Sequence, residues 1–114
     1  MNQGDIIYVD FDPTKGREQA GYRPAVVISR TEYNNKRNLA LVCPITNTVK
    51  SLRFHVLLDD RTQTQGDIIC EQVRVIDLLI RKCKVVEKLP KDLLIKVLNA
   101  VSIIISLDDE DLSN

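Results

Sequence analysis

Residues 16–29, GREQAGYRPAVVIS, change at Pro24 from turn-forming chemistry to an apolar segment typical of a β-strand. The proline ring biases the preceding residue, Arg23, towards extended backbone and away from helix. Arg23 therefore lies where a strand begins, with a long cationic side chain on a restricted backbone. A guanidinium in this position is well placed to meet an anion at the end of a sheet.

Short strand-like segments recur along the chain. Five of them are predicted as strands, at residues 5–11, 24–30, 39–46, 53–58 and 67–76. Turn-forming residues fill the intervals 12–22, 31–38, 46–51 and 59–66, which are predicted as loops. A further strand at 82–88 is expected after a helical turn around 77–81. The pattern indicates a mainly β protein with a small antiparallel sheet or barrel.

In the C-terminal third, the spacing of the apolar residues changes from every second residue to every third or fourth residue. Pro90 occupies a position where the first turn of a helix tolerates a missing donor, and apolar residues recur on one face at Leu94, Val97, Leu98, Val101, Ile104 and Ile105. One amphipathic helix is predicted over about residues 90–106. We expect a single domain over 1–107, followed by an acidic, disordered tail over 108–114.

Composition and length exclude several classes of protein. The chain has 114 residues, 44% hydrophobic and 28% charged, as an ordinary soluble domain does. It has neither an apolar run long enough to span a bilayer nor a signal peptide, so a cytoplasmic protein with no membrane partner is expected. Its cysteines show no metal or redox spacing, and buried, inert thiols are expected at Cys43, Cys70 and Cys83. No metal and no cofactor are predicted.

The formal net charge of zero conceals an uneven distribution. Between Lys15 and Arg53, eight lysines and arginines accompany only two glutamates, an excess of six positive charges. A local excess of this kind attracts phosphates, and it is also what a solvated basic surface looks like. Charge alone leaves both interpretations open.

The loops offer one set of residues that suits RNA cleavage by the substrate's own 2′-hydroxyl. Glu18 can act as the base, Arg23 can hold two phosphoryl oxygens through its planar fork, and Thr46 can donate a hydrogen bond to a third. No metal is required, because the nucleophile is already part of the substrate. Pro44 cannot donate in a sheet, so this end of the strand at 39–46 is predicted to be an edge or a bulge. Each residue also has an ordinary structural role: an ion pair, a solvated carboxylate or a turn hydrogen bond.

The blocks GDIIYVDFDPTKGREQAGYRPAVVISRTEYNN, LVCPITNT and CEQVRVID closely resemble the MazF/PemK family of bacterial ribonuclease toxins. The similarity covers about Gly4 to Ser106 and is most specific in the first block. It implies an SH3-like barrel with a terminal helix (the CcdB/MazF/PemK-like fold), acting as a homodimer that cuts single-stranded RNA without a metal. It also implies a cognate, MazE-like antitoxin whose flexible acidic segment would cover the basic groove.

The resemblance assigns the family's usual catalytic pair to Arg23 and Thr46, and a candidate base to Glu18. Some PemK-like relatives use a histidine before that glutamate and an Arg-x-Asp set in the fifth strand, where this chain has Arg17, Ile69 and Glu71. That version of the site is therefore not expected here. The only histidine, His55, is predicted to be an exposed strand residue with no catalytic role.

RNA contacts are predicted from aromatic residues that can stack on bases and from cations that can follow the phosphates. Tyr8, Phe11 and Phe54 are expected to pack in or against the barrel. The predicted RNA-binding residues are Tyr22 and Tyr33 in loops, together with Lys15, Arg17, Lys36, Arg37, Thr48, Lys50 and Arg53.

Two alternative functions remain open at the level of sequence. A CcdB-like gyrase inhibitor would share the fold, but the tryptophan of that family is absent because the chain has no Trp. A non-catalytic RNA-binding barrel would use the same cations without cutting the RNA.

Overall fold

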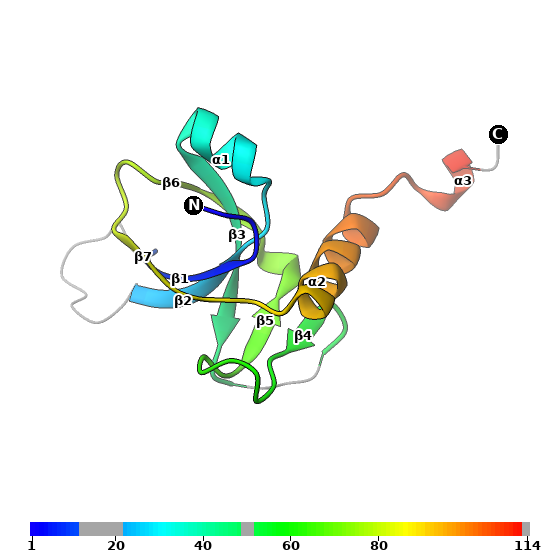
Figure 1. The fold of residues 1–114 in the computed structure, drawn as a ribbon. Helices are drawn as coiled ribbons and strands as arrows, with labels where there is room; N and C mark the ends of the chain where they lie inside the picture. The colour runs from blue at the N-terminus through cyan, green and yellow to red at the C-terminus, as the bar shows by residue number, and fades with distance from the viewer. Residues whose placement is uncertain (12–21, 49–51, 113–114) are drawn as a thin grey trace.

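Short antiparallel strands and one long C-terminal helix build the molecule (Figure 1). The chain is described from a computed structural model, which places residues 1–11, 22–48 and 52–112. The strands are β1 (Asp5–Asp10), β2 (Tyr22–Val27), β3 (Leu39–Thr46), β4 (His55–Leu57), β5 (Asp67–Ile69), β6 (Arg74–Asp77) and β7 (Cys83–Lys88). The helices are α1 (Thr31–Arg37), the 3₁₀ turn η1 (Cys70–Gln72), α2 (Lys91–Ile104) and α3 (Asp109–Leu112).

Strand β3 lies at the centre of the sheet. The strand order is β4-β5-β3-β2-β1-β7, and β6 also pairs with β3. One edge of β3 pairs with β2, whereas the other pairs first with β6, up to Val42, and then with β5, from Ile45. The expectation that Pro44 marks a sheet edge is therefore wrong, because β3 is an inner strand. Pro44 lies where the partner of β3 changes from β6 to β5, a gap in the ladder that tolerates a missing donor.

The predicted continuous strand over 67–76 is in fact two strands. The 3₁₀ turn η1 begins at Cys70, whose buried side chain belongs to the core, and separates β5 from β6. This turn redirects the chain, so that β5 and β6 pair with different segments of β3. The sequence alternates only on the C-terminal side of the turn, at residues 73–75, and the interruption at Glu71 and Gln72 is too short to be interpreted as a break.

Both faces of the central strands are buried, in two hydrophobic clusters. Neighbouring residues of β1 point in opposite directions: Ile6 joins the cluster beneath α2, and Ile7 joins the cluster on the other face. Ala25 and Val26 of β2 divide in the same way. Burial on both faces explains why these strands are almost continuously apolar in sequence.

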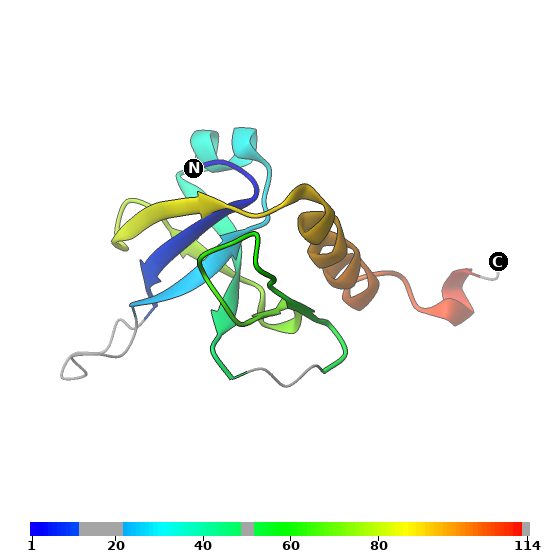
Figure 2. The same ribbon diagram turned by 60° about the horizontal axis from the view of Figure 1, so that its bottom comes forward.

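Helix α2 confirms the predicted amphipathic helix and covers one side of the sheet (Figures 1 and 2). Its C-terminal end differs from the prediction, because Ile104 and Ile105, expected on the apolar face, are exposed. Leu93 and Val97 of this helix are buried against the sheet. At its N-terminus, the carbonyl of Pro90 accepts hydrogen bonds from the amides of Leu93 and Leu94 at 3.0 Å. Where the sequence predicts a disordered tail, the structure describes the short helix α3, which extends away from the sheet. No helix in the described part of the chain is long and apolar enough to cross a membrane.

Helix α1 replaces the loop predicted for residues 31–38. Its Asn34 is 1% exposed, and the side-chain amide donates to the carbonyls of Met1, at 3.1 Å, and Ser29, at 3.2 Å. Asn38 ends the helix in the left-handed region, with φ 55°, and its amide donates to the carbonyl of Asn34. Asn34 therefore links α1 to the N-terminus and to the end of β2 through buried hydrogen bonds, and Asn38 caps the helix. Tertiary contacts override the turn preference that these residues show in isolation.

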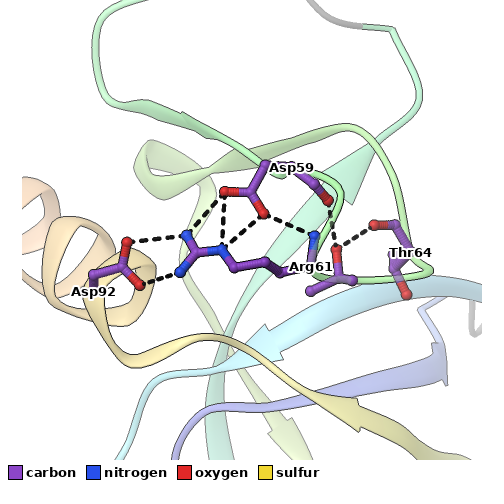
Figure 3. Close-up of polar contacts among 5 residues, drawn as sticks. Asp59, Arg61, Thr64 and Asp92 are labelled. Atoms are coloured by element: carbon purple, nitrogen blue, oxygen red, sulfur yellow. Dashed lines mark hydrogen bonds and ion pairs between the residues drawn. The ribbon is translucent and has the colours of Figure 1, made fainter.

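The connection between β4 and β5 is fastened at two points. Arg61 lies between Asp59 and Asp92 of α2 and donates a hydrogen bond of 2.8 Å to each carboxylate (Figure 3). These hydrogen bonds lower the pKa of both aspartates. On the other side, Glu87 of β7 accepts hydrogen bonds from the amide and hydroxyl of Thr64, both at 2.7 Å. The loop is thereby held against both α2 and β7.

We expect Leu93→Ala to lower the free energy of unfolding by about 3 kcal/mol, because it removes a buried side chain and leaves a cavity under α2. Ile95→Ala is the matched control. Ile95 lies on the same helix but is 49% exposed, so its truncation should cost under about 1 kcal/mol. Urea denaturation of the two variants measures the difference. Equal losses would show that α2 does not bury Leu93 against the sheet.

Candidate active site

Arg23 and Thr46 are brought together by the pairing of β2 with β3. Ala25 lies opposite Pro44 in this antiparallel pair. Arg23 lies two residues before Ala25 on β2, and Thr46 lies two residues after Pro44 on β3. Because the strands are antiparallel, both steps lead to the same end of the pair. The predicted pair therefore lies at equivalent positions on adjacent strands.

A cavity of about 290 Å³ lies at this end of the sheet and is lined by both residues. Their side chains therefore share one cavity, although they are more than twenty positions apart in sequence. Gln72 of η1 and Arg74 of β6 also line it, with apolar walls from Phe11, Pro44, Ile45 and Ile69. A concave surface with a few convergent polar groups is the usual form of a binding site.

The chemistry of the cavity suits an anion. Arg23 is exposed, and no carboxylate among the described residues forms an ion pair with it. The hydroxyl oxygen of Thr46 accepts a hydrogen bond from the amide of Thr48 at 3.2 Å. This contact uses the oxygen as an acceptor and leaves the hydroxyl proton for another partner. A guanidinium and a hydroxyl donor therefore face the same space.

Gly66 fixes the end of β3 that carries Thr46. Its φ of 127° lies outside the usual range for residues with a side chain, and a Cβ built on it would lie 2.1 Å from the carbonyl oxygen of Thr46. The close approach of the two backbones thus requires glycine. Because Gly66 ends the fastened loop between β4 and β5, the loop and the site are coupled mechanically.

His55 contradicts its prediction as an exposed residue. Its side chain is only 7% exposed, with Nδ1 3.3 Å from Asp67 and Nε2 3.6 Å from Glu71. Phe54 adopts a φ of 67°, which interrupts the simple alternation of the strand. The His55 ring lies between Asp67 of β5 and Glu71 of η1. His55 lines a second cavity, adjacent to the first, that also contains Thr46, Thr48 and Glu71.

The other predicted site residues are distributed unevenly. Glu18, Lys15, Arg17 and Lys50 lie outside the described residues. Tyr22 begins β2 beside Arg23, with its ring 5.8 Å from that of Tyr8, and is 52% exposed. Arg53 stacks on Phe54 with its guanidinium carbon 5.0 Å from the ring centre.

Tyr33, Lys36 and Arg37 lie on α1, at the opposite end of β3 from Thr46. None of the three lines the cavity that Arg23 and Thr46 share. The structure therefore does not bring them together with Arg23 and Thr46. Their role in RNA binding stays a prediction.

The cysteines match their expected environment. Burial is the main cause that raises the pKa of Cys43 to about 12 and that of Cys70 to about 11. Cys83 is half-buried, and burial raises its pKa as well. Thiols with raised pKa values remain protonated and unreactive at neutral pH.

Gln72 and Arg74 are the cavity residues that sequence reasoning missed. Both fall in the segment predicted as one regular strand, and no role was predicted for either residue. Only the turn at η1 directs them to the cavity. The signal that could have revealed Arg74 is its place in the block CEQVRVID, which carries part of the family resemblance.

Comparison with known proteins decides the family. A family model described as "PemK-like, MazF-like toxin of type II toxin-antitoxin system" matches residues 2–105. This chain belongs to that toxin family. The endoribonuclease toxin MazF of Escherichia coli K12 is 48% identical over 75 residues, covering 66% of this chain and 67% of the relative. The endoribonuclease PemK of Escherichia coli is 34% identical over 110 residues, covering 93% and 83% respectively.

Solved structures agree with this placement. A MazE–MazF structure from Deinococcus radiodurans superposes with a TM-score of 0.86 at 28% identity, covering 95% of this chain and 97% of that chain. A MazF structure from the same organism gives a TM-score of 0.83 at 28% identity, covering 94% and 97%. The predicted family and the predicted fold are both confirmed.

We expect Gly66→Ala to displace the Thr46 carbonyl by about 1 Å, because the new Cβ would overlap it. Gly4→Ala is the matched control: Gly4 also has a positive φ, of 91°, but its Cβ would meet only the Leu94 and Lys88 side chains, at 3.3 Å or more. Both variants should lose stability through backbone strain. Only Gly66→Ala should perturb the amide resonances of Thr46 and Thr48 strongly. Similar perturbation by both variants would remove the assigned role of Gly66.

Proposed function

We propose that this toxin-family chain is an endoribonuclease that cuts single-stranded RNA at short sequences without a metal ion. The observation that carries the proposal is the cavity shared by Arg23 and Thr46, which come from two adjacent strands. The relatives named endoribonucleases support the activity. The geometry supports the assignment of its chemistry to these two residues.

The reaction we propose is an internal transfer at phosphorus. The substrate's 2′-oxygen forms a bond to the scissile phosphorus while the bond to the 5′-oxygen breaks. The 2′-proton passes to a base, and the leaving 5′-oxygen gains a proton. The products are a 2′,3′-cyclic phosphate and a free 5′-hydroxyl. Negative charge accumulates on the non-bridging oxygens at the transition state, and pre-placed donors stabilise it there.

Arg23 supplies the strongest of these donors. Its planar fork can hold two phosphoryl oxygens at once, and its charge is uncompensated by any carboxylate in the described part of the chain. Thr46 donates its hydroxyl proton to a third oxygen while the Thr48 amide holds the hydroxyl in place. Glu18 is the candidate base, and it lies outside the described residues.

Restraint by an antitoxin belongs to the same proposal. Structural neighbours include complexes whose names pair MazF with MazE. We propose that a flexible acidic segment of a cognate antitoxin occupies the basic cavity and masks Arg23, because carboxylates imitate the phosphates of RNA. A homodimer acting in the cytoplasm completes the assignment.

The decisive test is cleavage of a single-stranded RNA by the purified protein in EDTA, with sequencing of the product ends. Wild type should cut at defined short sequences. Arg23→Ala and Thr46→Val should each lower kcat by about a hundredfold, as the loss of a transition-state donor often does. Thr46→Ser should retain most activity, because it keeps the hydroxyl.

Arg30→Gln is the matched control for charge. Arg30 is exposed and precedes α1, at the other end of β2 from Arg23, so its loss should leave cleavage unchanged. Full activity in both site variants would refute the catalytic assignment. Binding of RNA by wild type with no cleavage would instead indicate a non-catalytic RNA-binding barrel.

A further inference from the structure

A second arginine lines the cavity that contains Arg23 and Thr46. Arg74 is the first residue of β6 and pairs with Val42 of β3. Strand β2, which carries Arg23, lies on the other edge of β3. The two guanidinium groups therefore enter the cavity from strands on opposite sides of β3.

Phe11 holds the Arg74 guanidinium in place. The guanidinium carbon lies 4.9 Å from the centre of the Phe11 ring. Phe11 itself packs against the hydrophobic cluster formed by β1, β2 and β3, so the ring is a fixed platform. A cation on the face of an aromatic ring keeps its hydrogen-bond donors free at its edge. Arg74 is thus positioned before any ligand arrives.

No carboxylate in the described part of the chain neutralises Arg74 or Arg23. Other arginines of this protein do have acceptors: Arg61 pairs with Asp59 and Asp92, and Arg81 donates to the carbonyl of Asp10 at 2.8 Å. Two cations in one cavity repel each other, and this repulsion is relieved when an anion binds between them. The cavity therefore favours a ligand with more than one negative group.

We propose that Arg74 binds the phosphate next to the scissile one and so sets the register of the RNA in the site. The proposal rests on the proposed function. Arg23 and Thr46 already supply donors for the oxygens of the scissile phosphate, and Arg74 approaches from the other side of β3. Successive phosphates of one strand match two cations placed in this way. Arg74 is then a residue for substrate affinity, whereas Arg23 acts on the chemical step.

The experiment uses the RNA sequence that the wild-type protein cuts. One oligonucleotide carries a 2′-deoxy sugar at the cleavage position, which removes the nucleophile and allows binding to be measured by fluorescence anisotropy. Two others carry a neutral methylphosphonate at the phosphate on the 5′ or the 3′ side of the scissile one. The variants are Arg74→Gln, Arg74→Lys and Phe11→Leu, with Arg30→Gln as control.

Arg74→Gln should raise Kd and KM by about tenfold, the loss expected for a charge-assisted hydrogen bond, and leave kcat within about threefold. The slope of log affinity against log salt should fall by about 0.7, which corresponds to one phosphate contact. Arg74→Lys should fall between wild type and Arg74→Gln. Phe11→Leu should weaken binding by about threefold through the loss of the stacked ring.

One methylphosphonate should weaken binding to wild type by about tenfold but leave Arg74→Gln unaffected, because the variant has already lost that contact. Losses that simply add at both positions would overturn the proposal, as would an Arg74→Gln variant that behaves like Arg30→Gln. A kcat loss as large as that of Arg23→Ala would overturn it too, by placing Arg74 on the scissile phosphate.

Failure of this inference is distinguishable from failure of the proposed function. If Arg23→Ala is inactive and Arg74→Gln is silent, the nuclease assignment stands and the role of Arg74 is refuted. If wild type binds RNA but does not cut it, the affinities of wild type and Arg74→Gln for unmodified and methylphosphonate RNA can still be compared. The RNA is then the sequence that wild type binds best. An Arg74-dependent contact would then stand without the catalytic function.

Discussion

The antiparallel register between β2 and β3 is the constraint on which the site depends. With Ala25 opposite Pro44, the strand ends carry Arg23 and Thr46 to equivalent positions at one cavity. A slip of one residue would turn every side chain of a strand to the other face of the sheet. Both faces of β2 are buried in separate clusters of different shape, so such a slip would exchange residues between the clusters and leave cavities in one and overpacking in the other. The energy of the core thus fixes the geometry of the site.

The far end of β3 needs a second support, since β2 pairs with it only as far as Pro44. That support comes from β5, where Thr46 lies opposite Asp67, and from the close approach of Gly66. Burial raises the pKa of Glu87, but hydrogen bonds from Thr64 and Gln63 outweigh this effect and keep it below its ordinary value. The carboxylate therefore stays ionised as it holds the loop that leads to Gly66. Contacts well outside the cavity determine where Thr46 lies.

Sequence reasoning found the features that depend on local pattern and missed those that depend on tertiary contacts. The period of two located β1 to β3, and the helical period located α2. Helix α1 was missed because Asn34 looks like a turn residue until its buried partners are known. The burial of His55 was missed because an irregular backbone at Phe54 and a cover from η1 have no periodic signal. Arg23 and Thr46 could be found from the resemblance, but their convergence required the register.

The distribution of charge shows how the cavity stays available to a ligand. Arg61 is held by two carboxylates, whereas Arg23 and Arg74 have no carboxylate partner in the described part of the chain. Arg74 is held instead by the Phe11 ring, which orients a guanidinium without satisfying its donors. An internal carboxylate would compete with every phosphate that entered. Orienting a cation with an aromatic ring therefore preserves both its position and its affinity for an incoming anion, whether that anion belongs to RNA or to an acidic protein segment.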